Sequence, residues 1–116
     1  MLAPASPITE ADVIRASREV VATLDESFFR VRFDRLTQAE KRYLRAMAAL
    51  GPGSHRSGDI AELLRRSVQA FGPIRSKLIL KGMIWSPTHG DTAFTVPLFD
   101  EFMKRIMPGD DWNTDA

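Results

Sequence analysis

Hydrophobic residues recur at every third or fourth position through the first third of the chain. The apolar positions are Val13, Ala16, Val20, Leu24, Phe28 and Val31. This spacing predicts one long amphipathic helix over residues 9–34, with Thr9 and Asp12 resembling a capping box at its start. Alternation from Phe29 to Asp34 also suits a strand, but the continuing helical spacing favours a helix. Residues 1–8 hold two prolines without periodicity and predict a flexible N-terminus.

In a second region, residues 35–108, the segments with regularly spaced apolar residues are shorter, and glycine, proline or polar residues separate them. Thr37 and Glu40 form a capping box, and the helix that follows should end at Gly51. Its expected buried face is Tyr43, Leu44, Met47, Ala48 and Leu50. Ser54–Arg56 is expected to be a loop, and Ser57 the N-cap of a second helix that ends near Leu64.

A third helix is expected from about Gln69 to Lys81, because Pro73 is tolerated only in a first turn and Gly82 suits a helix end. Its expected inner face is Phe71, Ile74 and Leu78, and its outward face is Gln69, Ala70, Pro73, Ser76, Lys77 and Leu80. The order of short helix, turn, second helix and hairpin is typical of a winged helix-turn-helix.

The C-terminal third predicts a β-hairpin, a last helix and an acidic tail. The predicted segments are a strand at 83–86, a turn at 87–91 and a return strand at 92–96. Trp85 and Phe94 are interpreted as facing each other as a packing pair. Pro97 should open the last helix, with Leu98, Phe99, Phe102, Met103 and Ile106 inside, and residues 109–116 form the acidic tail. The predicted fold class is mainly α with a small β-hairpin wing: a winged helix-turn-helix with an extra long N-terminal helix.

Composition excludes several classes of protein but does not identify a function. The 116 residues, 44% hydrophobic and 27% charged, suit a single globular domain with one core. The absence of cysteine excludes disulfides and thiolate metal sites and fits a cytoplasmic location. No apolar run approaches the ~18 residues of a membrane helix, so no membrane partner is expected.

Charge is distributed unevenly although the net charge is only +1. Residues 53–81 contain six Lys or Arg against two acidic residues, whereas residues 82–116 contain two against six. Concentrated positive charge of this kind favours binding to a phosphate backbone. A solvated mixed surface is the other interpretation.

Several separate blocks between Phe28 and Met107 resemble one known region. They are Phe28–Thr37, Tyr43–Ala48, His55–Ala61, Lys81–Ile84 and Phe94–Phe99. Together they resemble the C-terminal winged-helix end of bacterial AAA+ ATP-binding proteins of the origin-recognition initiator type. In that family an ATPase core and a helical lid precede this region, so the resemblance implies that residues 9–34 correspond to the last lid helix. This sequence lacks the Gly-Lys-Ser/Thr loop of the ATPase, and Arg65–Ser67 stands where the family pattern has a glycine-containing turn.

The predicted function is therefore binding of double-stranded DNA, with weak or limited sequence specificity, through the helix around residues 69–81. The candidate DNA-binding residues are Arg56, Ser57, Gln69, Arg75, Ser76, Lys77, Lys81 and His89. Gln69 could pair with adenine, and Arg75 or Lys77 with guanine or phosphate. Arg42 and Arg45 could clamp phosphates or form ordinary salt bridges. His89 could equally be a simple exposed turn residue.

No catalytic, metal or cofactor site is predicted. The adjacent pairs Asp25-Glu26 and Asp100-Glu101 point to different sides of a helix and cannot readily share a proton. The two histidines have no further ligand at metal-binding spacing. The alternative to DNA binding is a protein-interaction module, in which the N-terminal helix forms a homodimer or docks on an AAA+ partner chain.

Overall fold

The computed structural model describes residues 9–113 and divides the chain into two compact units, Met1–Asp34 and Arg35–Ala116. Two predicted segments lie outside the described residues: the flexible terminus at residues 1–8 and the last part of the acidic tail, residues 114–116. The first unit contains α1 (Glu10–Leu24), a π-helical turn (Asp25–Phe29) and α2 (Arg30–Phe33). The second contains α3 (Gln38–Leu50), β1 (Ser54–Arg56), α4 (Ser57–Leu64), α5 (Gly72–Leu80), β2 (Ile84–Trp85), β3 (Asp91–Phe94) and α6 (Phe99–Ile106), with short 3-10 turns at Val68–Phe71 and Asp111–Asn113.

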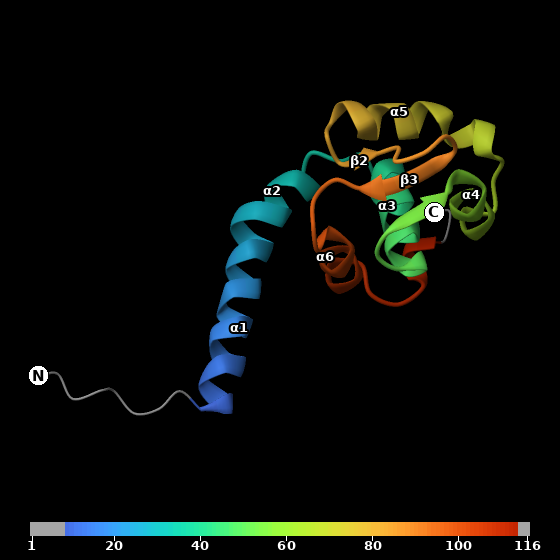
Figure 1. Cartoon of the computed structure of the whole chain (residues 1–116). Helices are drawn as coiled ribbons and strands as arrows, with labels where there is room; N and C mark the ends of the chain where they lie inside the picture. The colour runs from blue at the N-terminus through green and yellow to red at the C-terminus, as the bar shows by residue number, and fades with distance from the viewer. Residues whose placement is uncertain (1–8, 114–116) are drawn as a thin grey trace, which may run out of the picture. The chain divides into compact units, whose positions relative to one another are not determined.

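The first unit is helical throughout residues 10–33, as the apolar spacing predicts (Figure 1). The predicted capping box is present: Asp12 N–H donates to Thr9 Oγ1 at 3.1 Å, and Thr9 N–H to Asp12 Oδ2 at 3.2 Å. The choice of helix over strand is confirmed at α2. The π-helical turn between α1 and α2 was not expected, because side-chain spacing does not reveal one extra residue in a helical turn.

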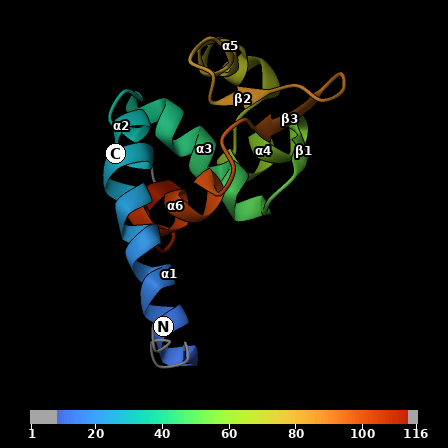
Figure 2. The same cartoon turned by 60° about the vertical axis from the view of Figure 1, so that its left-hand side comes forward.

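Helix α3 is the centre of the second unit, where it contacts α4, α5 and α6 (Figures 1 and 2). Its predicted capping box is confirmed, with Thr37 Oγ1 accepting from Glu40 N–H and Glu40 Oε1 from Thr37 N–H. Tyr43, Leu44, Met47 and Ala48 are buried as expected. Leu50, the last residue of the helix, is exposed and so is not part of this buried face. The helix ends at Gly51, whose φ of 104° favours glycine.

The sheet has three antiparallel strands in the order β1-β3-β2, not the two of a hairpin. The prediction of a loop at Ser54–Arg56 is therefore wrong: these polar residues pair with β3 through their backbone and carry no alternation that would reveal a strand. The prediction that Trp85 and Phe94 face each other as a pair is also wrong. Phe94 lies opposite Ile84, Trp85 lies opposite Ala93, and the Trp85 side chain is exposed.

Helix α5 occupies most of the range of the helix that is predicted to contact DNA, and α4 precedes it. Arg56, not Ser57, is the N-cap of α4, and the cap has no side-chain hydrogen bond. Pro73 lies in the first turn of α5, as predicted. Of the expected inner face of α5, Phe71 and Leu78 are buried and Ile74 is partly exposed. Its six expected outward residues are all exposed, but the helix begins at Gly72 and not near Gln69, so Gln69 and Ala70 lie in the 3-10 turn before it.

The last helix covers α3 and is followed by an ordered C-terminal turn. It begins at Phe99, two residues after Pro97, because Leu98 has a left-handed backbone and is its N-cap. Leu98 is 55% exposed and so does not join the core, whereas Phe99, Phe102 and Met103 are buried. Ile106 is partly exposed.

Arg45 joins α3 to this C-terminal turn. Its Nε donates to the Met107 carbonyl at 2.7 Å, and its guanidinium carbon lies 4.8 Å from the centre of the Trp112 ring. Trp112 itself donates to the Gly109 carbonyl at 2.7 Å. Arg45 is buried, so the interpretation of this residue as a phosphate clamp is wrong. It holds the C-terminal turn against α3 instead.

Candidate functional site

An open groove of about 350 Å³ lies where α4, α5 and the turn between β2 and β3 approach one another. Helix α3 contributes Tyr43 to its lining, the turn contributes Ser86, His89 and Gly90, and the rest comes from α4, α5 and the segment before α5. The remaining lining residues are Ser57, Val68, Phe71, Gly72, Arg75 and Ser76. The groove therefore combines an apolar end with a set of hydroxyl groups, one guanidinium and one imidazole.

Arg75 fastens α5 to the sheet beneath it. Its Nε donates to the Thr92 hydroxyl at 3.0 Å, and its Nη2 donates to the Asp91 carbonyl at 3.1 Å. Both acceptors belong to β3. The two bonds use the fixed fork of a guanidinium, which a lysine cannot reproduce. Arg75 therefore holds the amino-terminal half of α5 against the strand that leads out of the turn.

A buried cluster of hydroxyl groups surrounds this contact. Tyr43 and Thr92 are buried, and Ser57 Oγ lies 3.5 Å from Thr92 Oγ1. Burial raises the pKa of the Tyr43 phenol above its ordinary value, and hydrogen bonds with Thr92 and Ser57 and the charge of Arg75 oppose that rise. Tyr43 is therefore a neutral hydrogen-bonding group at neutral pH, and α3, α4, α5 and β3 meet through polar side chains at this point.

The turn at residues 86–91 is braced by its own hydrogen bonds. Ser86 Oγ donates to the Thr88 carbonyl at 2.7 Å, and Thr88 Oγ1 donates to Asp91 Oδ2 at 2.8 Å. Gly90 has a φ of 83°, a conformation that favours glycine, and its carbonyl accepts from Ser57 N–H at 2.9 Å. The turn is thus attached to the start of α4, which fixes one wall of the groove.

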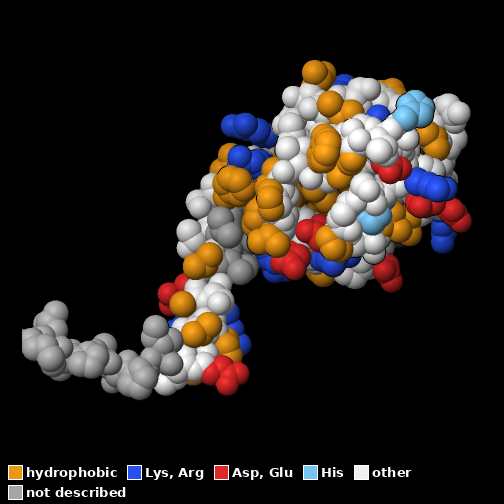
Figure 3. Space-filling view, in the orientation of Figure 1, with side chains coloured by type: hydrophobic (Ala, Val, Ile, Leu, Met, Phe, Trp, Pro, Cys, Tyr) orange, Lys and Arg blue, Asp and Glu red, His pale blue; other side chains and the backbone are white. Residues whose placement is uncertain are grey.

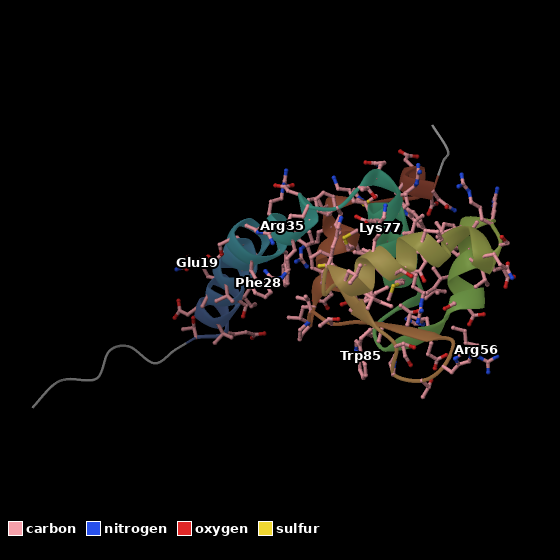
Figure 4. The ribbon with its side chains drawn as sticks, turned by 90° about the horizontal axis from the view of Figure 1, so that it is seen from above. Glu19, Phe28, Arg35, Arg56, Lys77 and Trp85 are labelled. Carbon is pink, nitrogen blue, oxygen red and sulfur yellow. The ribbon has the colours of Figure 1, made fainter. Side chains whose placement is uncertain are left out.

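Four of the eight candidate DNA-binding residues line this groove: Ser57, Arg75, Ser76 and His89. Arg56, Gln69 and Lys77 are exposed but are not part of its lining. Figure 4 looks down on α5 and shows Lys77 beside this helix, with Arg56 and Trp85 on the side of the strands. Any surface that uses all of these residues would extend outward from the groove on both sides.

Lys81 is placed differently from the other candidates. Its Nζ lies 2.6 Å from Glu40 Oε1 and also donates to the Arg35 carbonyl at 3.0 Å. Burial works to raise the pKa of Glu40, but hydrogen bonds from Lys81 and Thr37 and the charge of Lys81 outweigh it, so the pKa lies below its ordinary value. Lys81 is thus the counterion of a carboxylate that is 1% exposed.

Tyr43, Thr92 and Ser86 were missed as site residues. The predicted buried face of α3 includes Tyr43, and a buried phenol needs a hydrogen-bond partner, which is the signal that could have pointed to a polar site. Thr92 and Ser86 carry no comparable signal, because their roles depend on the register of β3 and on the path of the turn.

Comparison with known proteins places the chain in a family. Residues 26–103 match the family described as a domain of unknown function, DUF8462, and the chain belongs to that family. A search of curated proteins and a search of solved structures each gave no match. The family match includes the whole groove and the end of the N-terminal helical segment, but it begins after the end of α1.

Residues 9–113 contain no group of three His, Cys, Asp or Glu side chains arranged to hold a metal ion. Over the same residues, the structure has no helix with the length and apolar character needed to cross a membrane.

Proposed function

We propose that this chain is a winged-helix module that binds double-stranded DNA without catalysing a reaction. In chain order, α3, β1, α4, α5, β2 and β3 follow the pattern of a winged helix-turn-helix. On this interpretation α5 is the recognition helix and the turn at residues 86–91 is the wing. This function is the one implied by the resemblance to the C-terminal region of AAA+ ATP-binding proteins. It does not include ATPase activity.

The observation that carries the proposal is the Arg75 contact. By fastening α5 to β3, Arg75 makes the amino end of the proposed recognition helix and the proposed wing two walls of one groove. Ser57 and Ser76 bring hydroxyl groups to this groove, and hydroxyl groups commonly contact phosphate oxygens in protein–DNA complexes. His89 adds an imidazole to the same groove. A DNA strand would cross the groove with its backbone between helix and wing.

Charge around the groove supports a phosphate ligand. Lys81 is paired with Glu40, but Arg56, Arg65 and Lys77 are exposed in the same part of the chain. Asp91 is the acidic residue nearest the wing tip, and the Thr88 hydroxyl donates to it. Attraction of this kind is independent of base sequence and weakens as salt rises.

The outward face of α5 supports weak discrimination between sequences. Pro73 and Leu80 on α5, and Ala70 in the 3-10 turn before it, are exposed, and their side chains offer no hydrogen bond to a base edge. Ser76 and Lys77 on α5, and Gln69 in the 3-10 turn before it, are the exposed side-chain donors of the predicted outward set. We therefore expect phosphate contacts to supply most of the affinity.

Fluorescence anisotropy with a labelled random duplex tests the proposal. Lys77→Ala should lower affinity about five-fold at moderate salt and should reduce the slope of log K against log salt by about one, as the loss of one phosphate contact requires. Lys104→Ala is the matched control, because Lys104 is exposed on α6 and its loss changes the net charge equally. The proposal fails if the wild-type chain shows no binding at low salt, or if both variants weaken binding equally.

A further inference from the structure

The first unit, considered by itself, exposes apolar side chains along its helical segment. Val13 is 53% exposed, Val20 58% and Phe28 37%. Figure 3 shows hydrophobic side chains along this helix between acidic and basic ones. Val13 and Val20 are seven residues apart, so they lie on one face of α1. An apolar face of this length on a helix is typical of a surface that packs against another helix.

The middle of this face is shaped for close approach. A shallow hollow of about 410 Å³ is lined by Ala16, Glu19, Val20 and Thr23. Ala16 and Thr23 are small and lie one turn on either side of Val20. Small side chains beside a larger apolar one leave room for a knob from a facing helix. The partner that fits is therefore a second helix.

The charges at the two ends of the segment select the partner and its direction. Glu10 and Asp12 are in the first turn of α1, whereas Arg30 and Arg32 are in α2 at the other end. Arg30 lies 3.4 Å from the Asp34 carboxylate, and the Arg32 guanidinium carbon lies 3.8 Å from the centre of the Phe28 ring, so both cations also have a contact within their own segment. Two copies that pack in parallel would place like charges side by side. Two copies that pack antiparallel would place the acidic end of each beside the basic end of the other, so the segment is complementary to itself in that direction only.

We propose that the chain forms a two-fold symmetric homodimer through antiparallel packing of residues 10–33. Such an interface is isologous, since the same surface is used by both copies. A helix of this length extends about 36 Å, and Val20 lies near its middle. In this arrangement Val20 packs beside Val20 of the second copy, and Val13 lies near Phe28 of the second copy. The proposal concerns the first unit only and does not depend on DNA binding by the second.

Sedimentation equilibrium of the full chain over a range of concentrations tests the association. We expect the mass to approach twice that of one chain as concentration rises. Val20→Glu should abolish association, because it would place two carboxylates together at the symmetry axis. Ala22→Glu is the matched control: Ala22 is exposed, its place two residues on puts it on the opposite face of α1, and association should persist. Wild-type chain that stays monomeric at every concentration overturns the proposal.

Disulfide cross-linking tests whether the two helices pack antiparallel. Because the sequence contains no cysteine, only the introduced cysteines can form disulfides. A Val13→Cys chain mixed with a Phe28→Cys chain should give a mixed disulfide on oxidation, and neither variant should cross-link efficiently with its own copies. Val20→Cys should cross-link with itself, and Ala22→Cys should not. A self-disulfide of Val13→Cys with no mixed product would show parallel packing and would overturn the proposal. Circular dichroism of each variant should match that of the wild type, because these side chains are exposed.

Discussion

Glu40 and Lys81 form an ion pair in which one member is buried and the other is partly exposed. The Glu40 carboxylate is 1% exposed, and within the described part of the chain its Oε2 has no hydrogen-bond partner, so the Lys81 ammonium group on Oε1 is its counterion. Removing the cation from such a pair leaves an uncompensated buried charge. We expect Lys81→Met to lower the free energy of unfolding by about 3 kcal/mol at pH 7. Urea unfolding measures this, with Lys104→Met as the exposed control.

The same pair predicts a dependence of stability on pH. The pKa of Glu40 is lower in the folded chain than its ordinary value, so the pair stabilises the fold above that value and loses its effect as pH falls through the lowered pKa. The difference between wild type and Lys81→Met should therefore shrink on acidification from pH 6 to pH 3. Urea midpoints at several pH values measure it. A difference that stays constant over this range would contradict the assignment of the pair.

Arg65 predicts a stabilising substitution. It has a φ of 60° in the left-handed region, where it ends α4. A non-glycine residue is strained in this conformation, and glycine is the usual residue at such a helix end. Arg65→Gly should raise the free energy of unfolding by about 1 kcal/mol. Arg66→Gly removes the same charge at a residue without a positive φ and should not stabilise. Thermal unfolding of the two variants provides the comparison.

At the scale of elements, Arg75 determines how the proposed recognition helix and wing are held together. Arg75→Lys keeps the positive charge but cannot make both bonds to β3. If Arg75 acts by positioning, this variant should bind DNA several-fold more weakly with an unchanged salt slope, and amides of residues 86–92 should exchange hydrogen faster. If Arg75 contacts phosphate directly through its charge, the lysine variant should retain most of the affinity and the turn should stay protected. Anisotropy and hydrogen exchange together distinguish the two roles.

The elements that the sequence predicts well are those stabilised by local signals. The two capping boxes at Thr9 and Thr37, the glycine end of α3 and Pro73 in α5 are each specified within a few residues. Strand β1 was missed because Ser54–Arg56 becomes a strand only by pairing with β3, which lies more than thirty residues later. The register of Trp85 against Ala93 likewise depends on the path of the turn, which local patterns do not encode.

In the candidate site, too, local sequence signals predict some features and tertiary contacts determine the others. Ser57, Arg75, Ser76 and His89 were selected from charge, polarity and an expected helix and turn, and they line one groove. The roles within the groove required tertiary contacts. Arg75 binds β3 and Lys81 binds Glu40, so two of the basic residues predicted for DNA make hydrogen bonds within the fold. The density of positive charge along a sequence therefore overestimates the charge available to a ligand.

At the scale of the whole molecule, the two proposals make a joint prediction. If residues 10–33 join two copies and each second unit binds DNA, then binding of one unit raises the effective concentration of the other. Val20→Glu lies outside the DNA-binding unit, yet it should weaken binding to a long duplex by separating the copies. It should leave binding to a duplex that is too short for two units nearly unchanged.

Anisotropy titrations with duplexes of roughly 12 and 40 base pairs test this, since one helical turn is about 10 base pairs. We expect Val20→Glu to lower affinity for the long duplex about ten-fold or more, a modest share of the gain that linked sites can provide. Ala22→Glu carries the same added charge on the opposite face of α1 and should bind both duplexes like the wild type, apart from a small common effect of charge. Equal losses for the two variants would attribute the effect to charge alone. A dimer that binds both duplexes equally tightly would show that its two DNA-binding units cannot engage one duplex together.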